Sequence, residues 1–334
     1  MNITVIGAGA IGGLLAAKLA VAGERVGVVA RGEHLKAIRE RGLVLKEGTK
    51  ETVVSVDATD RIAEAGRPDL VVLAVKAHQL APIAADVASI LSPATMVLTA
   101  QNGLPWWYFF KHGGPHEGVR LKSVDPGGVI ADHLASDAII AGIVYQAAEI
   151  ESPGVIRHIE GNRFPVAEID GARTERVAAL SRMLFNAGFK SPALTDVRAE
   201  IWMKLWGNLA FNPISALARA NLDDICRFPP TRALAAAMMR EGQAVGEAFG
   251  IRFRIPVEQR IAGAEGIGAH KTSMLQDVEH GRAIEIEALL GSVIELARLA
   301  DIATPHLDAV YAVAKLLGET LGQGVGPPAL APAQ

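Results

Sequence analysis

The first half of the chain alternates short apolar runs, rich in β-branched residues, with longer stretches of helical pattern. The short runs are ITVIG, RVGVVA, DLVVLAVKA and TMVLTAQNG, and the longer stretches include GGLLAAKLAVAG and APIAADVASILS. This alternation is typical of βαβ units, in which helices cover both faces of a parallel sheet. We therefore predict an α/β N-terminal domain with a Rossmann-type doubly wound parallel sheet.

From about Asp196 the pattern becomes long and helical, as in AEIWMKLWGNLAFNPISALARA, TRALAAAMMREGQAVGEAFG, AIEIEALLGSVIELARLA and HLDAVYAVAKLLGETLG. These stretches predict an all-helical C-terminal domain. The segment GVIRHIEGNRFPVAEIDG predicts further strands that complete the first domain, and SPALTDV predicts the connection, with Thr195 or Asp196 capping the next helix. The expected organisation is a first domain over 1–194, a helical domain over 195–321 and a loose Gly/Pro/Ala-rich tail over 322–334.

Three glycines, Gly7, Gly9 and Gly12, follow the first apolar run in the spacing G-x-G-x-x-G and open the first helical stretch. In this context the first permits a tight turn, the second lets a pyrophosphate approach the backbone, and the third lets helix and strand pack closely. The helix N-terminus also offers N–H groups and a partial positive charge to phosphate. We predict that a dinucleotide binds along Gly7, Ala8, Gly9, Ala10, Ile11 and Gly12; the alternative is a glycine-rich turn that only packs.

Arg31 follows the second predicted strand, where NAD-binding members of this fold usually carry an acidic residue for the ribose 2′-hydroxyl. A guanidinium there suits the 2′-phosphate of NADP, because its planar fork pairs with phosphate through two hydrogen bonds. We therefore predict NADPH rather than NADH as the cofactor. The alternative explanation is an ordinary solvated charge at a strand end.

Two further predicted strands are followed by polar residues, Lys76 after VVLAV and Asn102 after MVLTAQ. Ligands of open α/β sheets bind beyond the carboxyl ends of the strands, so both side chains are expected at the same edge as the glycine motif. Taken singly, Lys76 is equally well explained as a surface charge and Asn102 as a turn residue before Gly103. Their coincidence at one edge favours a role in cofactor binding.

Lys204, Asn208 and Asn212 recur at a spacing of four in KLWGNLAFNP, which places them in one column on a helix face. An ammonium among tryptophan and leucine side chains is costly unless it has partners or a shifted pKa, and a shifted lysine can donate a proton near neutral pH. Reduction of a ketone needs such a donor, because hydride addition puts negative charge on the oxygen. The alternative is that Lys204 extends to water and both asparagines face solvent.

Ser273 and Glu285 lie in the stretch TSMLQDVEHGRAIEIEALL, Ser273 in its polar part and Glu285 at the start of an apolar helix. A carboxylate near Lys204 would hold the ammonium or accept a substrate hydroxyl, and a serine hydroxyl would bind a substrate carboxylate. The alternatives are structural: a helix cap for Ser273 and an N-terminal charge favoured by the helix dipole for Glu285.

Composition supports a small-molecule partner. The chain has 334 residues, half of them apolar, so it is long enough for two domains. The formal net charge is −3, and Lys and Arg are dispersed, which argues against nucleic acid as the main partner. The oligomeric state, a homodimer included, is left open.

The remaining residues suggest a reducing compartment and no metal. The single cysteine, Cys226, cannot form an internal disulfide and is expected to be a small buried hydrophobe. No signal peptide and no apolar run long enough for a membrane span is present, so we expect a cytoplasmic protein without membrane contact. His112 and His116 have a ligand-like spacing, but Gly-Gly-Pro between them breaks a helix face.

These motifs together resemble the ketopantoate reductases (2-dehydropantoate 2-reductases), which use NADPH to reduce ketopantoate to pantoate on the route to pantothenate. The resemblance runs from GAGAIGG through VKAHQL, QNG and KLWGNLAFNPISAL to TSMLQDVEHGRAIEIEALLG, and it covers the chain to about residue 317. The pattern K-x3-N-x3-N, followed much later by SMLQD and a helix-opening Glu, is not a general Rossmann feature.

The resemblance implies a role for each candidate residue. Lys204 is implied as the general acid, and Glu285 as the residue that orients this lysine and the substrate. Asn208 and Asn212 would bind the hydroxyl end of the substrate, and Ser273 would also bind substrate. Lys76 and Asn102 would line the cofactor and carbonyl region. The polar column is then expected to form one wall of a cleft between the two domains.

The sequence departs from the family pattern after QNG, where it continues LPWWYFFKHGGPHEG instead of a compact glycine-rich segment. The aromatic residues either reshape the substrate pocket or anchor a loop or a subunit contact. A reshaped pocket would admit a bulkier 2-oxo acid or ketone. An alternative of another class is an NADPH-sensing regulatory protein that performs no reduction, against which the complete set of candidate catalytic residues argues.

Overall fold

The computed structural model describes residues 1–322. These residues form two compact units that divide between Val197 and Arg198, beside the predicted connection 191–197. The predicted tail begins at Gly322, which is the last residue of α12 (Pro305–Gly322), and its other residues, 323–334, lie outside the described part.

The first unit contains a seven-stranded sheet in the order β11-β8-β7-β6-β1-β2-β5. Its strands are β1 (Asn2–Ile6), β2 (Arg25–Val29), β5 (Asp57–Thr59), β6 (Leu70–Leu73), β7 (Met96–Thr99), β8 (Ile139–Gly142) and β11 (Val166–Glu168). All neighbouring pairs are parallel except β11 with β8. The predicted Rossmann-type parallel sheet is therefore confirmed, with one antiparallel strand at its edge.

A second sheet of four strands, in the order β4-β3-β10-β9, was not predicted as a separate element. Its strands are β3 (Leu43–Glu47), β4 (Lys50–Val54), β9 (Ala147–Ser152) and β10 (Val155–Glu160). β10 pairs with β3 in parallel and with β9 antiparallel. The strands predicted within 154–171 thus exist but divide between two sheets, since β10 joins the small sheet and β11 the large one.

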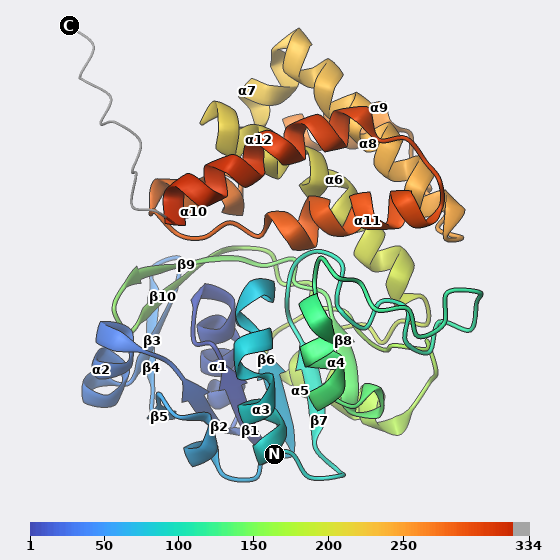
Figure 1. Ribbon diagram of the computed structural model, residues 1–334. Helices are drawn as coiled ribbons and strands as arrows, with labels where there is room; N and C mark the ends of the chain where they lie inside the picture. The colour runs from blue at the N-terminus through green and yellow to red at the C-terminus, as the bar shows by residue number, and fades with distance from the viewer. Residues whose placement is uncertain (323–334) are drawn as a thin grey trace, which may run out of the picture. The chain divides into compact units, whose positions relative to one another are not determined.

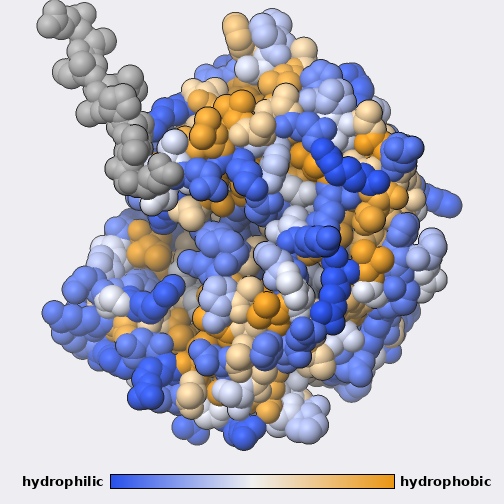
Figure 2. Space-filling view, viewed as in Figure 1, coloured by the Kyte–Doolittle hydropathy of each residue, from blue (hydrophilic) through white to orange (hydrophobic). Residues whose placement is uncertain are grey.

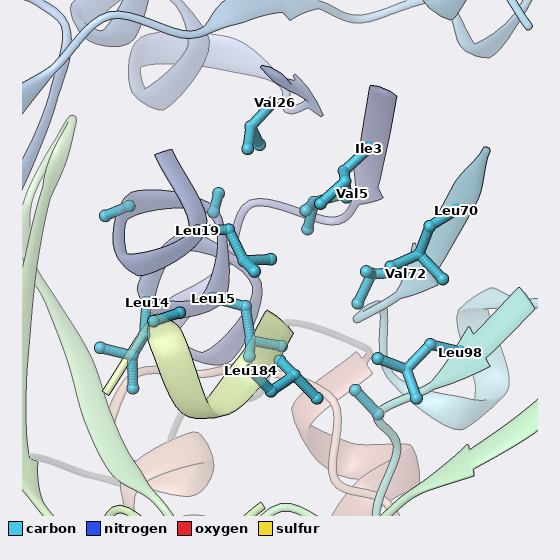
Figure 3. Packing of buried hydrophobic residues seen from close by; sticks show 14 of the residues in the cluster. Ile3, Val5, Leu14, Leu15, Leu19, Val26, Leu70, Val72, Leu98 and Leu184 are labelled. Atoms are coloured by element: carbon cyan, nitrogen blue, oxygen red, sulfur yellow. The ribbon is translucent and has the colours of Figure 1, made fainter. Parts of the chain in front are cut away.

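Helix α1 (Ala10–Val21) contacts strands of both sheets, which explains why it is apolar on almost every side. In Figure 1 it lies between β1 and β2 on one side and β9 and β10 on the other. Figure 3 shows its leucines packed near residues of β1, β2, β6, β7 and α5. The other helices of this unit are α2 (Gly32–Arg41), α3 (Ala84–Ile90), α4 (Val129–His133) and α5 (Glu175–Asn186).

Among the described residues of the second unit, every regular element is a helix, as predicted. Its helices are α6 (Val197–Ala218), α7 (Leu222–Arg227), α8 (Pro229–Ala248), α9 (Val257–Glu265), α10 (Ser273–Glu279), α11 (Ser292–Leu299) and α12. The helix predicted over 283–300 is not regular, because a π-helical turn, Glu287–Gly291, precedes α11. The indole of Trp206 on α6 donates a hydrogen bond to the carbonyl of Met239 on α8 (2.7 Å), which ties these two helices together.

Across residues 1–322, no helix combines the length and the apolarity that a membrane crossing requires. Figure 2 shows hydrophilic and apolar residues interspersed over the visible face.

Candidate active site

Two of the three glycines in the segment between β1 and α1 have a stereochemical reason. Gly7 has φ of +95°, and its N–H and that of Ala8 both donate to the carbonyl of Val29 at 3.1 Å. A Cβ atom on Gly12 would lie 2.0 Å from the carbonyl oxygen of Gly7, whereas a Cβ on Gly9 would meet nothing within 4 Å. The turn and the helix–strand packing therefore need the outer glycines, and the open space at Gly9 fits the approach of a phosphate group.

Four predicted residues follow neighbouring parallel strands and lie at the same edge of the large sheet: Gly7 after β1, Arg31 after β2, Lys76 after β6 and Asn102 after β7. Arg31 is exposed, and its carbonyl accepts a hydrogen bond from the first turn of α2. Lys76 and Asn102 are half-buried. The backbone N–H of Lys76 donates to Gln79 Oε1 at 3.2 Å, which shapes the turn after β6.

Lys204, Asn208 and Asn212 lie on α6 at the predicted spacing. Asn212 is 5% exposed and the other two are half-buried, so the alternative in which both asparagines face solvent is wrong. Burial lowers the pKa of Lys204 to about 8, and the carboxylate of Glu285 acts in the opposite direction. A lysine with such a pKa can release its proton near neutral pH, and the charge of Glu285 favours the protonated form.

Glu285 lies at the N-terminal end of its helix, where its carbonyl accepts a hydrogen bond from the N–H of Leu289 (3.3 Å). The π-helical turn begins two residues later at Glu287, and such turns are often found at functional sites. The side chain of Glu285 is half-buried. Its position at a helix N-terminus agrees with the structural alternative, but its effect on the pKa of Lys204 shows that it also acts on the candidate acid.

Ser273 is the first residue of α10 and is exposed. The residue that caps this helix is Thr272, whose hydroxyl accepts a hydrogen bond from the N–H of Leu275 at 3.2 Å. The alternative explanation of Ser273 as a helix cap is therefore wrong. Its role in substrate binding stays a prediction.

The aromatic segment after Asn102 is packed into the protein. Trp106, Trp107, Tyr108 and Phe109 are each at most 3% exposed. The ring of Phe109 lies 4.9 Å from that of Tyr108 and 5.4 Å from those of both His112 and His116, centroid to centroid. Of the two explanations, these contacts favour a loop anchored by its own side chains.

Cys226 is buried, as predicted, and its Sγ lies 3.8 Å from the carbonyl oxygen of Ile261. Burial raises the pKa of its thiol. The residue therefore packs as a small apolar side chain and is poorly suited to act as a nucleophile.

One residue near the glycine-rich segment was not predicted. His34 on α2 accepts a hydrogen bond from the N–H of Gly154, in the turn between β9 and β10, at Nδ1 (3.0 Å). Burial lowers the pKa of its ring, and the backbone carbonyl of Ala8 raises that pKa to a smaller extent. In the sequence, His34 lies in RGEHL, three residues after Arg31. Nothing in this pattern connects it to a turn 120 positions further along the chain.

Two family models match the chain. The one described as "Ketopantoate reductase PanE/ApbA" matches residues 3–112, and the one described as "Ketopantoate reductase PanE/ApbA C terminal" matches residues 196–318. The two matches contain the glycine-rich segment with Arg31, Lys76 and Asn102, and the α6 column with Ser273 and Glu285, respectively.

Individual relatives agree over nearly the full length. A 2-dehydropantoate 2-reductase from Mesorhizobium japonicum is 51% identical over 96% of this chain and 99% of its own. A solved structure from Ralstonia solanacearum MolK2 is 38% identical, with a TM-score of 0.92 over 96% of this chain and 98% of its own. The ternary structure of D-mandelate dehydrogenase with NADH and anilino(oxo)acetate has a TM-score of 0.82 over 96% of this chain and 100% of its own, at 22% identity, and shares the fold. The chain belongs to the ketopantoate reductase family of dinucleotide-binding oxidoreductases.

Proposed function

We propose that this protein reduces ketopantoate to pantoate with NADPH. The observation that carries the proposal is the electrostatic environment of Lys204, since burial brings its pKa to about 8 while the charge of Glu285 favours its charged form. This is the behaviour required of an acid that protonates an oxygen near neutral pH. The 51% identity to a protein named 2-dehydropantoate 2-reductase supports ketopantoate as the substrate.

NADPH is proposed over NADH because of Arg31. The residue follows β2 and is exposed, so its guanidinium can reach a 2′-phosphate without first leaving a buried partner. The open space beside Gly9 and the helix that begins at Ala10 suit the pyrophosphate of either dinucleotide. Arg31 is thus the residue that would distinguish the two cofactors.

In the proposed reaction the dinucleotide, when bound, supplies the hydride that forms the new C–H bond at the carbonyl carbon. The carbonyl π electrons move to oxygen, and the ammonium of Lys204 donates the proton that forms the O–H bond. Lys204 is then reprotonated by water. Glu285 keeps the lysine charged before the proton is transferred and lets it recover the proton afterwards.

The other candidates would hold the substrate. Asn208 and Asn212 lie along α6 beyond Lys204, so their amides would bind the hydroxyl end of ketopantoate. Ser273 would also bind the substrate, through its hydroxyl. Lys76 and Asn102 would line the region of the cofactor and the carbonyl group.

Two other functions remain to be tested against this proposal. A reductase of a bulkier 2-oxo acid or ketone would need space around the aromatic segment, which its packing does not favour. A sensor that binds NADPH without reducing anything has no need of a lysine with a lowered pKa beside a carboxylate.

Steady-state NADPH oxidation tests the proposal with ketopantoate, 2-oxoisovalerate and phenylglyoxylate as substrates. We expect kcat/KM to be highest for ketopantoate. A higher value for phenylglyoxylate would reject the substrate assignment and favour a bulkier 2-oxo acid. Tight NADPH binding without turnover of any oxo acid would instead support the sensor.

A further inference from the structure

His34 connects three segments around the glycine-rich turn. It lies on α2, and its Nδ1 accepts the hydrogen bond from Gly154 at the β9–β10 turn. That turn is itself fixed on α2, because Arg41 donates to the carbonyl of Pro153 (3.1 Å) and a Cβ on Gly154 would lie 3.0 Å from the Cβ of Ala37. The imidazole therefore has little freedom to rotate.

The hydrogen bond from Gly154 fixes the tautomer of His34. A backbone N–H can only donate, so Nδ1 must carry a lone pair and the proton of the neutral ring is on Nε2. Burial lowers the pKa of His34, and the carbonyl of Ala8 opposes this to a smaller extent. The ring is accordingly neutral at neutral pH, with an Nε2–H donor.

Nε2 is buried, and among the described residues no acceptor meets it with good hydrogen-bond geometry. A buried N–H without a partner is costly, so a small adjustment that completes the bond is favourable. A Cβ on Gly13 would lie 3.4 Å from the carbonyl oxygen of Ala8 and 2.7 Å from the side chain of Ile156 on β10, so this carbonyl lies beside the strand that follows Gly154. With Nδ1 engaged by Gly154, Nε2 is the ring nitrogen left to face it. That carbonyl belongs to the segment between Gly7 and Gly9.

The carbonyl of Ala8 and the N–H of Gly9 are parts of one trans peptide unit, so they point in opposite directions. A donor that holds the carbonyl on one side turns the N–H toward the other side. A Cβ on Gly9 would meet open space, and this is where the proposed function has the pyrophosphate approach. We propose that His34 is a positioning residue for the dinucleotide, whose Nε2–H binds the carbonyl of Ala8 and thereby orients the N–H of Gly9 toward phosphate.

This inference, which rests on the proposed function, is tested by two conservative variants that separate the two ring nitrogens. In His34→Gln the amide nitrogen replaces the Nε2–H donor but the acceptor for Gly154 is lost. In His34→Asn the amide oxygen replaces the Nδ1 acceptor but the donor to Ala8 is lost. Dissociation constants for NADPH and NADH are measured by fluorescence, with Tm for each variant and kcat at saturating cofactor.

We expect His34→Asn to keep a Tm near that of the wild type and to bind both dinucleotides about five- to tenfold more weakly, the effect of losing one hydrogen bond. His34→Gln should lower Tm and bind both within about twofold of the wild type. Values of kcat at saturating cofactor should be unchanged in both. His133→Gln is the matched control, because within residues 1–322 the hydrogen bond of His133 is to the carbonyl of Val129 in its own helix.

The opposite pattern, with normal binding in His34→Asn and weak binding in His34→Gln, would overturn the proposal and leave His34 as a structural link to Gly154. The proposal is also overturned if both variants bind the dinucleotides equally weakly, or if neither binds them more weakly than the wild type. A failure of the proposed function is seen separately, because the wild-type protein would then bind neither dinucleotide or reduce no oxo acid.

Discussion

The carbonyl oxygen of Gly7 lies 2.0 Å from the position that a Cβ atom on Gly12 would occupy. Two segments that meet this closely, the turn after β1 and the first turn of α1, leave no room for a side chain. Gly9, between them in sequence, would direct its Cβ into open space. Two glycines of one motif therefore differ in their surroundings: Gly12 is required by packing, whereas Gly9 faces the open space where the proposed function places phosphate.

We predict that Gly12→Ala and Gly9→Ala separate these roles. Gly12→Ala forces backbone apart and should destabilise the protein by about 2 kcal/mol or more, seen as a lower midpoint in urea unfolding. Gly9→Ala should leave that midpoint nearly unchanged, since Gly9 has φ of −66°, but should weaken dinucleotide binding. Normal stability of Gly12→Ala would show that the turn can move away from the helix.

The pH dependence of kcat/KM for reduction should have an upper limb set by Lys204. The reaction needs the ammonium, and its pKa in the ligand-free protein is about 8. The protonated fraction is therefore high at pH 7 and falls as the pH rises through 8, so kcat/KM should drop about tenfold per pH unit above that value. A profile that stays flat to pH 10 would exclude Lys204 as the acid.

Glu285→Gln should move this limb to lower pH. The carboxylate raises the pKa of Lys204, so removing its charge lowers that pKa further. At pH 8 the variant should then have a smaller protonated fraction and a lower kcat/KM than the wild type. Glu287→Gln is the control, because Glu287 pairs with Tyr311 and Lys315 and should leave the limb near 8.

Lys204→Ala should lower kcat by about 10² to 10⁴, the usual contribution of a positioned proton donor, while the NADPH dissociation constant changes little. Rapid-mixing and fluorescence titration measure the two quantities independently. Lys315→Ala, which removes an exposed lysine paired with Glu287, should leave both unchanged. Equal losses in kcat and in cofactor binding for Lys204→Ala would instead make Lys204 a structural or cofactor-binding residue.

Arg31→Ala should weaken NADPH binding by about tenfold or more and leave NADH binding nearly unchanged, because only the contact with the 2′-phosphate is removed. Comparing kcat/KM for the two cofactors before and after the change measures the effect directly. If both cofactors suffer alike, Arg31 acts on the shared part of the dinucleotide and the preference for NADPH has another origin.

Short-range sequence patterns predicted the helices, strands and turn that depend on interactions between residues close together in the sequence. The strands β1, β2, β6 and β7 follow from short β-branched apolar runs and the helix α1 from the longer apolar stretch after the glycines, and the Gly7–Gly12 spacing follows from the stereochemistry of one turn. The spacing of four in α6 likewise follows from helix geometry. Each of these depends on residues within about one or two turns of each other.

Contacts between residues far apart in the sequence could not be predicted from such patterns. β3 and β10 form a parallel pair although more than a hundred residues separate Leu45 from Ile156, and no repeat in the sequence links them. Glu285 could be proposed as a partner of Lys204 from its chemistry, but no sequence spacing places the two residues together, and only the family resemblance implied that role. The π-helical turn after Glu285 was missed because one additional residue in a turn leaves the apolar spacing nearly intact.

The parallel pairing of β3 with β10 also bears on how the protein is made. During synthesis β3 and β4 leave the ribosome long before β10 does, so the small sheet stays a two-stranded hairpin until residues 155–160 have emerged. An isolated two-stranded hairpin is only marginally stable in water, and one face of α1 depends on the complete sheet for its cover. Final folding of the first unit therefore waits for a late segment, and nascent chains shorter than this are the ones that chaperones must protect.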